Sequence, residues 1–450
     1  MKLKKYIVEK FNTPLCKVDY IILIGIVFIC YFSFENLDIT HTAGCSIAYL
    51  NGHFLDFYEY NAQFDLYPSY MPSTYLLFAI WNIPLKLLGL IDVPSREYTI
   101  PMIMWLKLLP TLFFAGSAII FWKICKTLNF SDLKAKLSTF IFLTTPIAIY
   151  SQFIFGQYDS FTLFFVLLGL LYYFRYKNAH FIAAFAIALT LKYFAFMIFV
   201  PLLFLREKKV WNLIKSGIGV MILFVVETLI YHGSTEMQVN VQGFSILEYF
   251  IRAHIDLGPY QISLMIIIWG LICVYAYFKN CKNSQEEIMW AIYLATLGIT
   301  SFFVFSVWHP QWLLLAAPFW VLSSVINKNY KTFFLLDGLT MLFYTMFNVN
   351  ININNVDQVL LNNGLWGLLY PNGIPFTITM SDLFIYKHIN IIVSILTLLF
   401  VVQAVYKHPK YMFNEVTTEI EESMGILRLR FIGGILIFLF PAFVCLFMSI

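Results

Sequence analysis

The sequence predicts an all-α integral membrane protein that crosses the bilayer many times. Of its 450 residues, 60% are hydrophobic and only 12% are charged. The mean hydropathy is +0.77, whereas a soluble domain carries about 25% charged residues. Apolar runs of the length needed to span a bilayer recur from one end of the chain to the other. These observations exclude an ordinary soluble enzyme and predict one membrane domain over residues 1–450.

The apolar runs predict about thirteen transmembrane helices. The first run follows the basic start MKLKK and has no small-residue cleavage site, so it is expected to remain as an anchor. The predicted spans are centred near residues 20–34, 102–122, 137–151, 160–174, 180–191, 194–205, 211–231, 259–278, 288–306, 311–326, 332–348, 388–405 and 431–449.

The distribution of Lys and Arg predicts the orientation. Loops rich in these residues stay on the cytoplasmic side. With a cytoplasmic N-terminus, the first outer loop is 35–101, the tail 407–430 is a solvated inner helix, and nearly all basic residues face inward. The exceptions among the 29 Lys and Arg are Lys86, Arg96, Lys107, Lys192, Arg252 and Lys387.

Two segments are interpreted so that this charge pattern holds. The apolar run 72–90 is expected to lie along the outer surface, because a crossing there would invert every later loop. The run 180–205 would be about 39 Å long as one helix. A single crossing would also move Arg206, Lys208 and Lys209 outside, so we expect two short helices that turn near Lys192.

Asp38 is the first candidate for chemistry. It follows the first span by about one helical turn, which places a carboxylate at the membrane surface, where it could act as a general base. The alternative is that Asp38 is only a polar residue at the solvent-exposed end of a helix, without a catalytic role. Glu35 lies in the same segment and is not excluded as the base.

The stretch FIFGQYDSFTLFF (153–165) interrupts two apolar runs with polar residues. Gly156 permits a tight turn, and Asp159 could cap the following helix. Gln157 is not needed for either purpose. Gln157 and Asp159 are expected on the same side as Asp38, where they could orient sugar hydroxyls, although a plain hairpin explains the spacing too.

Two lysines and the WHPQW segment supply further candidates. A lysine at membrane depth costs about 2.5–3.5 kcal/mol, so Lys192, and secondarily Lys107, could neutralise a lipid-linked phosphate. His309 and Gln311 open a later span from the outer side and could line the same site or belong to the aromatic belt. No metal-ligand spacing, nucleotide-binding loop or nucleic-acid patch is present, and a divalent ion is not required by any spacing.

These residues together resemble the GT-C glycosyltransferases. The resemblance rests on an acidic residue just past the first span, a Tyr-Pro…Tyr-Leu-Leu surface helix and the Gly-Gln-x-Asp-Ser turn. Residues 156–204 look like bacterial relatives of the GPI-anchor mannosyltransferases and like dolichyl-phosphate-glucose-dependent glucosyltransferases. The segment 307–320 is similar to their later His-containing turn. The resemblance covers a core over 20–320, whereas 321–450 matches only as further C-terminal helices, and YPSYMPSTY replaces a more usual Tyr-Pro-Pro-Leu.

The resemblance implies an inverting hexosyltransferase of mannose or glucose type, with its active site on the outer or lumenal face. The only sequon, Asn129-Phe-Ser131, is expected on the inner side, and this, with the Asn-, Lys- and Phe-rich composition, indicates a bacterial plasma membrane. Its donor would be a polyprenyl-phosphate sugar and its acceptor a lipid-linked or cell-envelope glycan, with no tightly bound cofactor and no nucleic acid. Asp38 would be the base, and Gln157, Asp159, Lys192 and His309 would bind the substrate. A polysaccharide polymerase or ligase and a lipid-linked sugar flippase are the alternatives.

Overall fold

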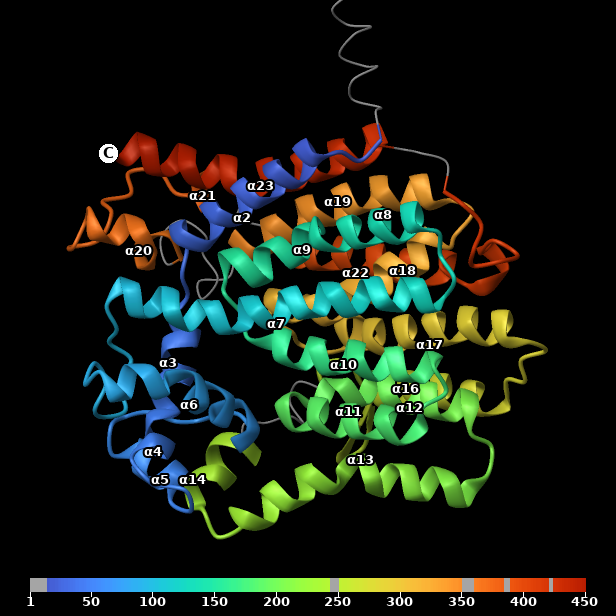
Figure 1. Ribbon diagram of the computed structural model, residues 1–450, viewed down its shortest axis with the longest axis horizontal. Helices are drawn as coiled ribbons and strands as arrows, with labels where there is room; N and C mark the ends of the chain where they lie inside the picture. Colours follow the sequence, from blue (N-terminus) through green and yellow to red (C-terminus); the bar gives the residue numbers. More distant parts are fainter. Residues whose placement is uncertain (1–13, 243–250, 350–359, 384–388, 421–423) are drawn as a thin grey trace, which may run out of the picture.

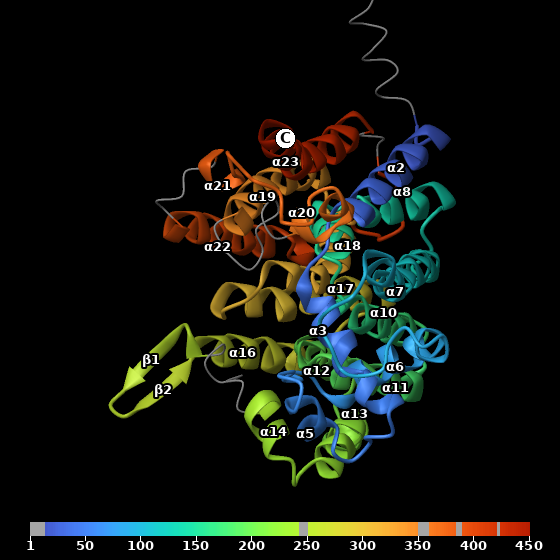
Figure 2. The same ribbon diagram turned by 90° about the vertical axis from the view of Figure 1, so that its left-hand side faces the viewer.

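The computed structural model describes residues 14–242, 251–349, 360–383, 389–420 and 424–450, and it is a layered bundle of helices (Figures 1 and 2). Most helices run between the two ends that lie left and right in Figure 1. Six helices are long and apolar enough to cross a membrane. They are α7 (Ile100–Thr127), α13 (Val210–Ile230), α17 (Ser284–Phe305), α19 (Tyr330–Val349), α22 (Ile389–Tyr406) and α23 (Met424–Ser449).

Two further candidates are bent pairs of helices. Helix α2 (Lys17–Ser33) is followed at 70° by Leu37–Leu50, and α8 (Asp132–Leu143) at 51° by Pro146–Ile154. With these pairs the number of candidate spans rises to eight. The all-α, polytopic character is therefore as predicted for the described residues, apart from one hairpin, but the expected count of thirteen spans is not confirmed.

The remaining elements are shorter. Among them, α10, α11 and α16 are apolar helices of 14 to 16 residues. The short helices are α3 (Leu37–Cys45), α4 (Ile47–Leu50), α5 (Phe57–Ala62), α6 (Pro72–Leu87), α9 (Pro146–Ile149), α10 (Asp159–Phe174), α11 (Asn178–Leu191), α12 (Phe196–Arg206), α14 (Thr235–Met237), α16 (Leu264–Phe278), α18 (Ala317–Val325), α20 (Leu360–Asn363) and α21 (Met380–Leu383). Short 3₁₀- or π-helical segments are η1 (Tyr150–Ile154), η2 (Tyr193–Ala195), η3 (Gln238–Gln242), η4 (Pro310–Leu315), η6 (Leu365–Leu368) and η8 (Pro409–Tyr411), and the strands are β1 (His254–Leu257) and β2 (Tyr260–Ser263).

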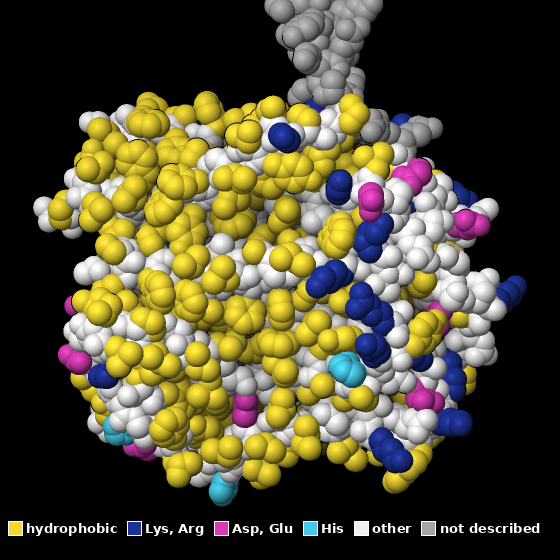
Figure 3. Space-filling view, viewed as in Figure 1, with side chains coloured by type: hydrophobic (Ala, Val, Ile, Leu, Met, Phe, Trp, Pro, Cys, Tyr) yellow, Lys and Arg dark blue, Asp and Glu magenta, His cyan; other side chains and the backbone are white. Residues whose placement is uncertain are grey.

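The two ends of the bundle differ in charge. Lys and Arg gather at the right-hand end in Figure 3, while apolar side chains cover most of the rest of this face. That end, here called the basic end, contains the connections 128–131, 175–177, 207–209, 279–283 and 326–329 (Figure 1). The opposite end contains α3 to α6 and is here called the site end. The one-sided distribution is the pattern from which the sequence predicted the orientation.

The break at Lys192 is confirmed. Helix α11 ends at Leu191, and Lys192 has an extended backbone (φ −159°, ψ 119°) before η2 and α12. Helices α10 and α11 pack closely because Gly169 has no side chain; a Cβ there would lie 2.5 Å from the Phe185 ring. The segment expected on the outer surface forms α6 at the site end, where it packs against α3, α4, α7 and α11.

The sequence misjudged the C-terminal part of the chain. The expected inner helix over 407–430 is not formed: residues 412–420 are irregular, and Val416 and Ile420 are buried. The last helix instead begins at Met424 and includes two arginines whose partners lie far away in the sequence. Arg428 pairs with Asp19 of α2, and Arg430 pairs with Asp337 of α19.

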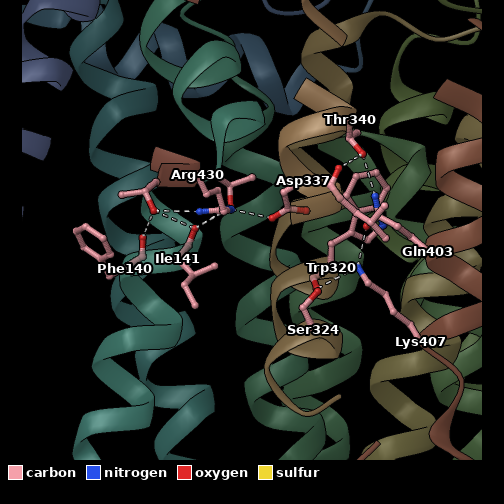
Figure 4. A network of polar contacts seen from close by, with 12 residues as sticks. Phe140, Ile141, Trp320, Ser324, Asp337, Thr340, Gln403, Lys407 and Arg430 are labelled. Atoms are coloured by element: carbon pink, nitrogen blue, oxygen red, sulfur yellow. Dashed lines mark hydrogen bonds and ion pairs between the residues drawn. The ribbon is translucent and has the colours of Figure 1, made fainter. Parts of the chain in front are cut away.

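Arg430 belongs to a buried polar network near the C-terminal helices (Figure 4). Its Nε lies 2.8 Å from Asp337 Oδ2, and its Nη2 donates to Thr145 Oγ1 at 2.9 Å. Beside it, Gln403 donates to Thr340 at 3.1 Å and Lys407 donates to the Trp320 carbonyl at 3.2 Å. Charges inside an apolar bundle persist only with such partners, so the network fixes α19, α22 and α23 against α8 and α18.

Candidate active site

Asp38 lies in the first turn of α3, just after helix α2. Helix α2 ends at Ser33, and the chain then bends by 70° before Leu37–Leu50, so Asp38 lies just beyond this bend. Asn36 caps α3: its side-chain oxygen accepts a hydrogen bond from the Asp38 backbone N–H at 2.8 Å. The cap and the bend together hold a half-buried carboxylate at the site end.

Tyr158 connects Asp38 to a part of the chain 120 residues away. Its hydroxyl donates to Asp38 Oδ1 at 3.4 Å and accepts from the Thr42 hydroxyl at 2.9 Å. Thr42 lies one turn after Asp38 on the same helix. This chain of hydrogen bonds fixes the side of α3 that carries Asp38 against the start of α10.

The polar break at residues 156–160 that the sequence singled out lies where η1 gives way to α10. The π-helical turn η1 ends at Ile154, and Gly156 has φ +78°, a left-handed conformation that glycine adopts at no steric cost. The Gln157 backbone N–H donates to the Ser151 carbonyl at 2.9 Å. The Gln157 side-chain oxygen accepts from the Tyr158 N–H at 3.0 Å. Gln157 therefore helps to shape the turn, in addition to any part it plays in binding.

Lys192 and Asp159 form a buried ion pair at 2.6 Å. Their side chains are 4% and 2% exposed. The Lys192 ammonium also lies 4.7 Å from the centre of the Trp312 ring. Lys192 lies at the break between α11 and α12, and its side chain reaches Asp159 at the start of α10. The second carboxylate oxygen of Asp159 has no hydrogen-bond partner among the described residues.

The charges of this cluster act on Asp38. Burial raises the pKa of its carboxyl to about 6, and the Asp159 carboxylate contributes in the same direction. The Lys192 charge and the hydrogen bond from Tyr158 oppose the rise. Asp38 is thus ionised at neutral pH, with a pKa near the range in which a carboxylate serves as a general base.

The structure also brings the WHPQW segment to this cluster. His309 is half-buried, and its ring centre lies 4.9 Å from that of Trp312, the residue that Lys192 faces. Gln311 is 5% exposed, and its side-chain oxygen has no hydrogen-bond partner among the described residues. Tyr158 therefore contacts Asp38 and Gln157, and Trp312 contacts Lys192 and His309. The two groups meet at Asp159, which follows Tyr158 in the chain and pairs with Lys192.

Lys107 occupies a different position. Its ammonium donates to the backbone carbonyls of Tyr31, Phe34 and Phe153, and its side chain is fully buried. It therefore ties the end of α2 to η1. Glu35 is buried nearby, and both of its carboxylate oxygens lack a hydrogen-bond partner within the described part of the chain.

The sequence alone did not single out Tyr158, Thr42, Tyr70 or Trp312 as parts of the site. The signal for Tyr158 was its position inside the Gly-Gln-x-Asp-Ser turn. Tyr70 packs edge-on against Tyr158, with ring centres 5.4 Å apart, and lies 5.9 Å from the Lys192 ammonium. Aromatic residues are so common in this chain that nothing in their spacing marks these particular ones.

No group of three or more His, Cys, Asp or Glu side chains that could hold a metal ion is found among the residues the structure describes. Comparisons of the whole chain with protein-family models, with curated proteins and with solved structures gave no match. The geometry of the site is therefore the basis for a functional proposal.

Proposed function

We propose that this protein is an inverting membrane glycosyltransferase that uses a polyprenyl-phosphate sugar as donor. One observation carries the proposal: the half-buried carboxylate of Asp38 accepts a hydrogen bond from Tyr158, which directly precedes Asp159 of the buried Lys192–Asp159 pair, and the charges of both members of that pair act on the pKa of Asp38, which is about 6. A base and a cation at one site are what transfer from a phosphate-linked donor needs.

In the proposed reaction, Asp38 accepts the proton of an acceptor hydroxyl as its oxygen attacks the anomeric carbon of the donor sugar. The new C–O bond forms on the face opposite the phosphate, so the configuration is inverted. The bond between the anomeric carbon and the phosphate oxygen breaks, and its electron pair leaves with the polyprenyl phosphate. Lys192 stabilises the phosphate charge, and Asp159 holds Lys192 in position.

The other residues of the cluster have supporting roles in this proposal. Gln157, His309 and Gln311 supply hydrogen-bonding groups for the sugar hydroxyls, and Tyr158 fixes the Asp38 carboxylate. Lys107 is assigned to shaping the site through its three carbonyl contacts, not to the phosphate. The acceptor is proposed to be a lipid-linked or cell-envelope glycan.

The proposed location is the bacterial plasma membrane, with the N-terminus in the cytoplasm and the site on the outer face. Support comes from the charge distribution: Lys and Arg gather at the basic end, and basic loops remain cytoplasmic. Asp38 lies at the opposite end, with α3 to α6 (Figure 1).

The test is sugar transfer in membranes from a host that lacks the gene, supplied with radiolabelled polyprenyl-phosphate sugars. Asp38→Asn is compared with wild type at equal expression, and Asp65→Asn is the matched control because Asp65 is an exposed carboxylate of the same segment. We expect transfer by wild type and by the control, and a loss of roughly 10²-fold or more in Asp38→Asn.

Equal transfer by wild type and Asp38→Asn would remove Asp38 from this role and turn attention to Glu35 or Asp159 as the base. Absence of transfer with every donor, together with movement of lipid-linked sugar across the membrane, would establish a flippase instead. Both outcomes differ from a folding defect, which size-exclusion chromatography of the purified variants detects independently.

A further inference from the structure

A two-stranded hairpin that the sequence did not reveal projects from the bundle. Strands β1 and β2 pair in antiparallel register, with Ile255 opposite Ile262 and Leu257 opposite Tyr260. Gly258 has φ +66° and precedes Pro259 at the turn, and glycine at the first central position is typical of a tight hairpin turn. The sequence predicted an outer loop up to residue 258 and a transmembrane helix over 259–278, but residues 260–263 form β2 and α16 begins only at Leu264.

The two faces of the hairpin have opposite character. Directly opposed residues lie on the same face, and successive residues alternate between faces. One face therefore carries Ile255, Leu257, Tyr260 and Ile262, and the other carries His254, Asp256, Gln261 and Ser263. The four apolar side chains are 39–72% exposed, the most exposed being Tyr260 at 72%.

The hairpin leads directly into an apolar helix that also exposes large apolar side chains. The Leu264 N–H donates to the Ala253 carbonyl at 2.8 Å, which joins the hairpin to the start of α16. Farther along α16, Ile266, Leu271, Val274 and Phe278 are 51–73% exposed. In the end-on view of Figure 2 the hairpin projects sideways from the bundle, and its main contacts among the described elements are with α16.

We propose that the apolar face of this hairpin binds the bilayer itself, at the boundary between headgroups and acyl chains. The lipid that covers the exposed side of α16 would continue beneath Ile255, Leu257, Tyr260 and Ile262. The amphipathic character limits the depth: His254, Asp256 and Gln261 remain in contact with water or headgroups. This inference does not depend on the proposed enzymatic activity.

The unpaired backbone groups of the hairpin also limit how deeply it can enter the bilayer. Each strand of a two-stranded hairpin has one edge of unpaired N–H and C=O groups, and such edges are not tolerated in the hydrocarbon region. An isolated two-stranded hairpin is also only marginally stable in water. Contact with lipid on one face, and with water along the edges, satisfies both requirements.

The test uses site-directed spin labels in the full-length protein reconstituted into phosphatidylcholine vesicles. Leu257→Cys and Ile262→Cys report on the apolar face, and their chain neighbours Asp256→Cys and Gln261→Cys are matched controls on the polar face. Cys16 and Cys281, which are not buried, are first replaced by serine so that they are not labelled. Collision rates are measured with oxygen, which concentrates in lipid, and with a water-soluble nickel chelate.

We expect the ratio of oxygen to nickel collisions to be several-fold higher at 257 and 262 than at 256 and 261. Equal access of the nickel chelate to all four positions would place the hairpin in water and overturn the proposal. Positions 257 and 262 closed to both reagents would mean that a protein surface, such as a second copy of the chain, covers the face, and would overturn it too. All four substitutions are at exposed positions, so failure to fold does not obscure the result.

Discussion

The ammonium of Lys192 lies 2.6 Å from the carboxylate of Asp159, and both side chains are almost completely buried. Asp159 begins α10, and Lys192 follows α11. The pair thus joins the turn at residues 155–159 to the break between two short helices. The Asp159 carboxylate neutralises the lysine charge before any substrate binds, so a donor phosphate would have to share Lys192 with Asp159.

Removing one member of this pair is expected to damage the fold, whereas removing both is not. Lys192→Met leaves a buried carboxylate without its partner, which costs about 3–5 kcal/mol. The double variant Lys192→Met/Asp159→Asn removes the uncompensated charge and should recover much of the lost thermal stability. Fluorescence-detected size-exclusion chromatography after heating measures this, and a double variant as unstable as the single one would contradict it.

The same double variant separates a structural role of Lys192 from a role in donor binding. If Lys192 stabilises the phosphate, the double variant should lack transfer even though its stability is recovered. Lys192→Arg should retain part of the transfer activity, with a higher KM for the donor. Near-wild-type kcat and KM in the double variant would assign Lys192 to structure alone. Initial rates against donor concentration give both constants.

The pH dependence of transfer should follow Asp38. Its pKa is raised to about 6 by burial, and the base must be deprotonated, so the rate should fall as the pH is lowered through about 6. The Tyr158 hydrogen bond lowers the pKa of Asp38. Tyr158→Phe should therefore raise this pKa and move the acidic fall of the pH–rate profile to higher pH. A pH–rate profile of kcat/KM for both proteins checks the shift, and a limb that stays in place would contradict the assignment of Asp38.

Lys107 is expected to affect stability more than substrate binding. Its ammonium is used by three backbone carbonyls that connect α2 to η1. Lys107→Met leaves those buried carbonyls without a donor, at about 1–3 kcal/mol for an unsatisfied group. We expect Lys107→Met to have a lower thermal midpoint and, in the protein that remains folded, an unchanged KM for the donor. A several-fold rise in that KM would instead show that Lys107 binds the donor phosphate.

The pair between Asp19 and Arg428 should be a major contact between the first and last described helices. Two hydrogen bonds of 2.7 and 2.8 Å join the guanidinium to the carboxylate. Asp19→Asn should lower the thermal midpoint by several degrees, because it leaves the arginine without its counter-charge. Lys328→Met is the control: Lys328 is an exposed cation at the basic end, and its loss should leave the midpoint unchanged.

Local features of the fold could be predicted from the sequence because their causes are local. The break at Lys192 followed from the length of the run and the charges after it, and the turn at 156–160 from Gly156 and its polar neighbours. The concentration of Lys and Arg at one end followed from the alternation of basic loops. The first two features depend on residues within a short window, whereas the charge distribution is a pattern of the whole chain that needs no knowledge of which residues touch.

Features that depend on distant partners could not be predicted in this way. Arg428 and Arg430 looked like solvated residues before a span, because Asp19 and Asp337 lie 409 and 93 residues away. Lys107 was predicted as a second phosphate ligand, and its contacts with three backbone carbonyls were not predicted because such partners carry no sequence signal. The hairpin did carry one, in the alternation of HIDL and YQIS around Gly258 and Pro259, but the apolar run that follows concealed it.

The placement of the two arginines has a consequence for biosynthesis. Asp19 and Asp337 emerge from the ribosome long before Arg428 and Arg430, so neither ion pair can form until α23 has been synthesised. The polar contacts of α23 with α2 and α19 are therefore made late in assembly. A chain whose translation stopped before residue 424 would lack the guanidinium partners of Asp19 and Asp337.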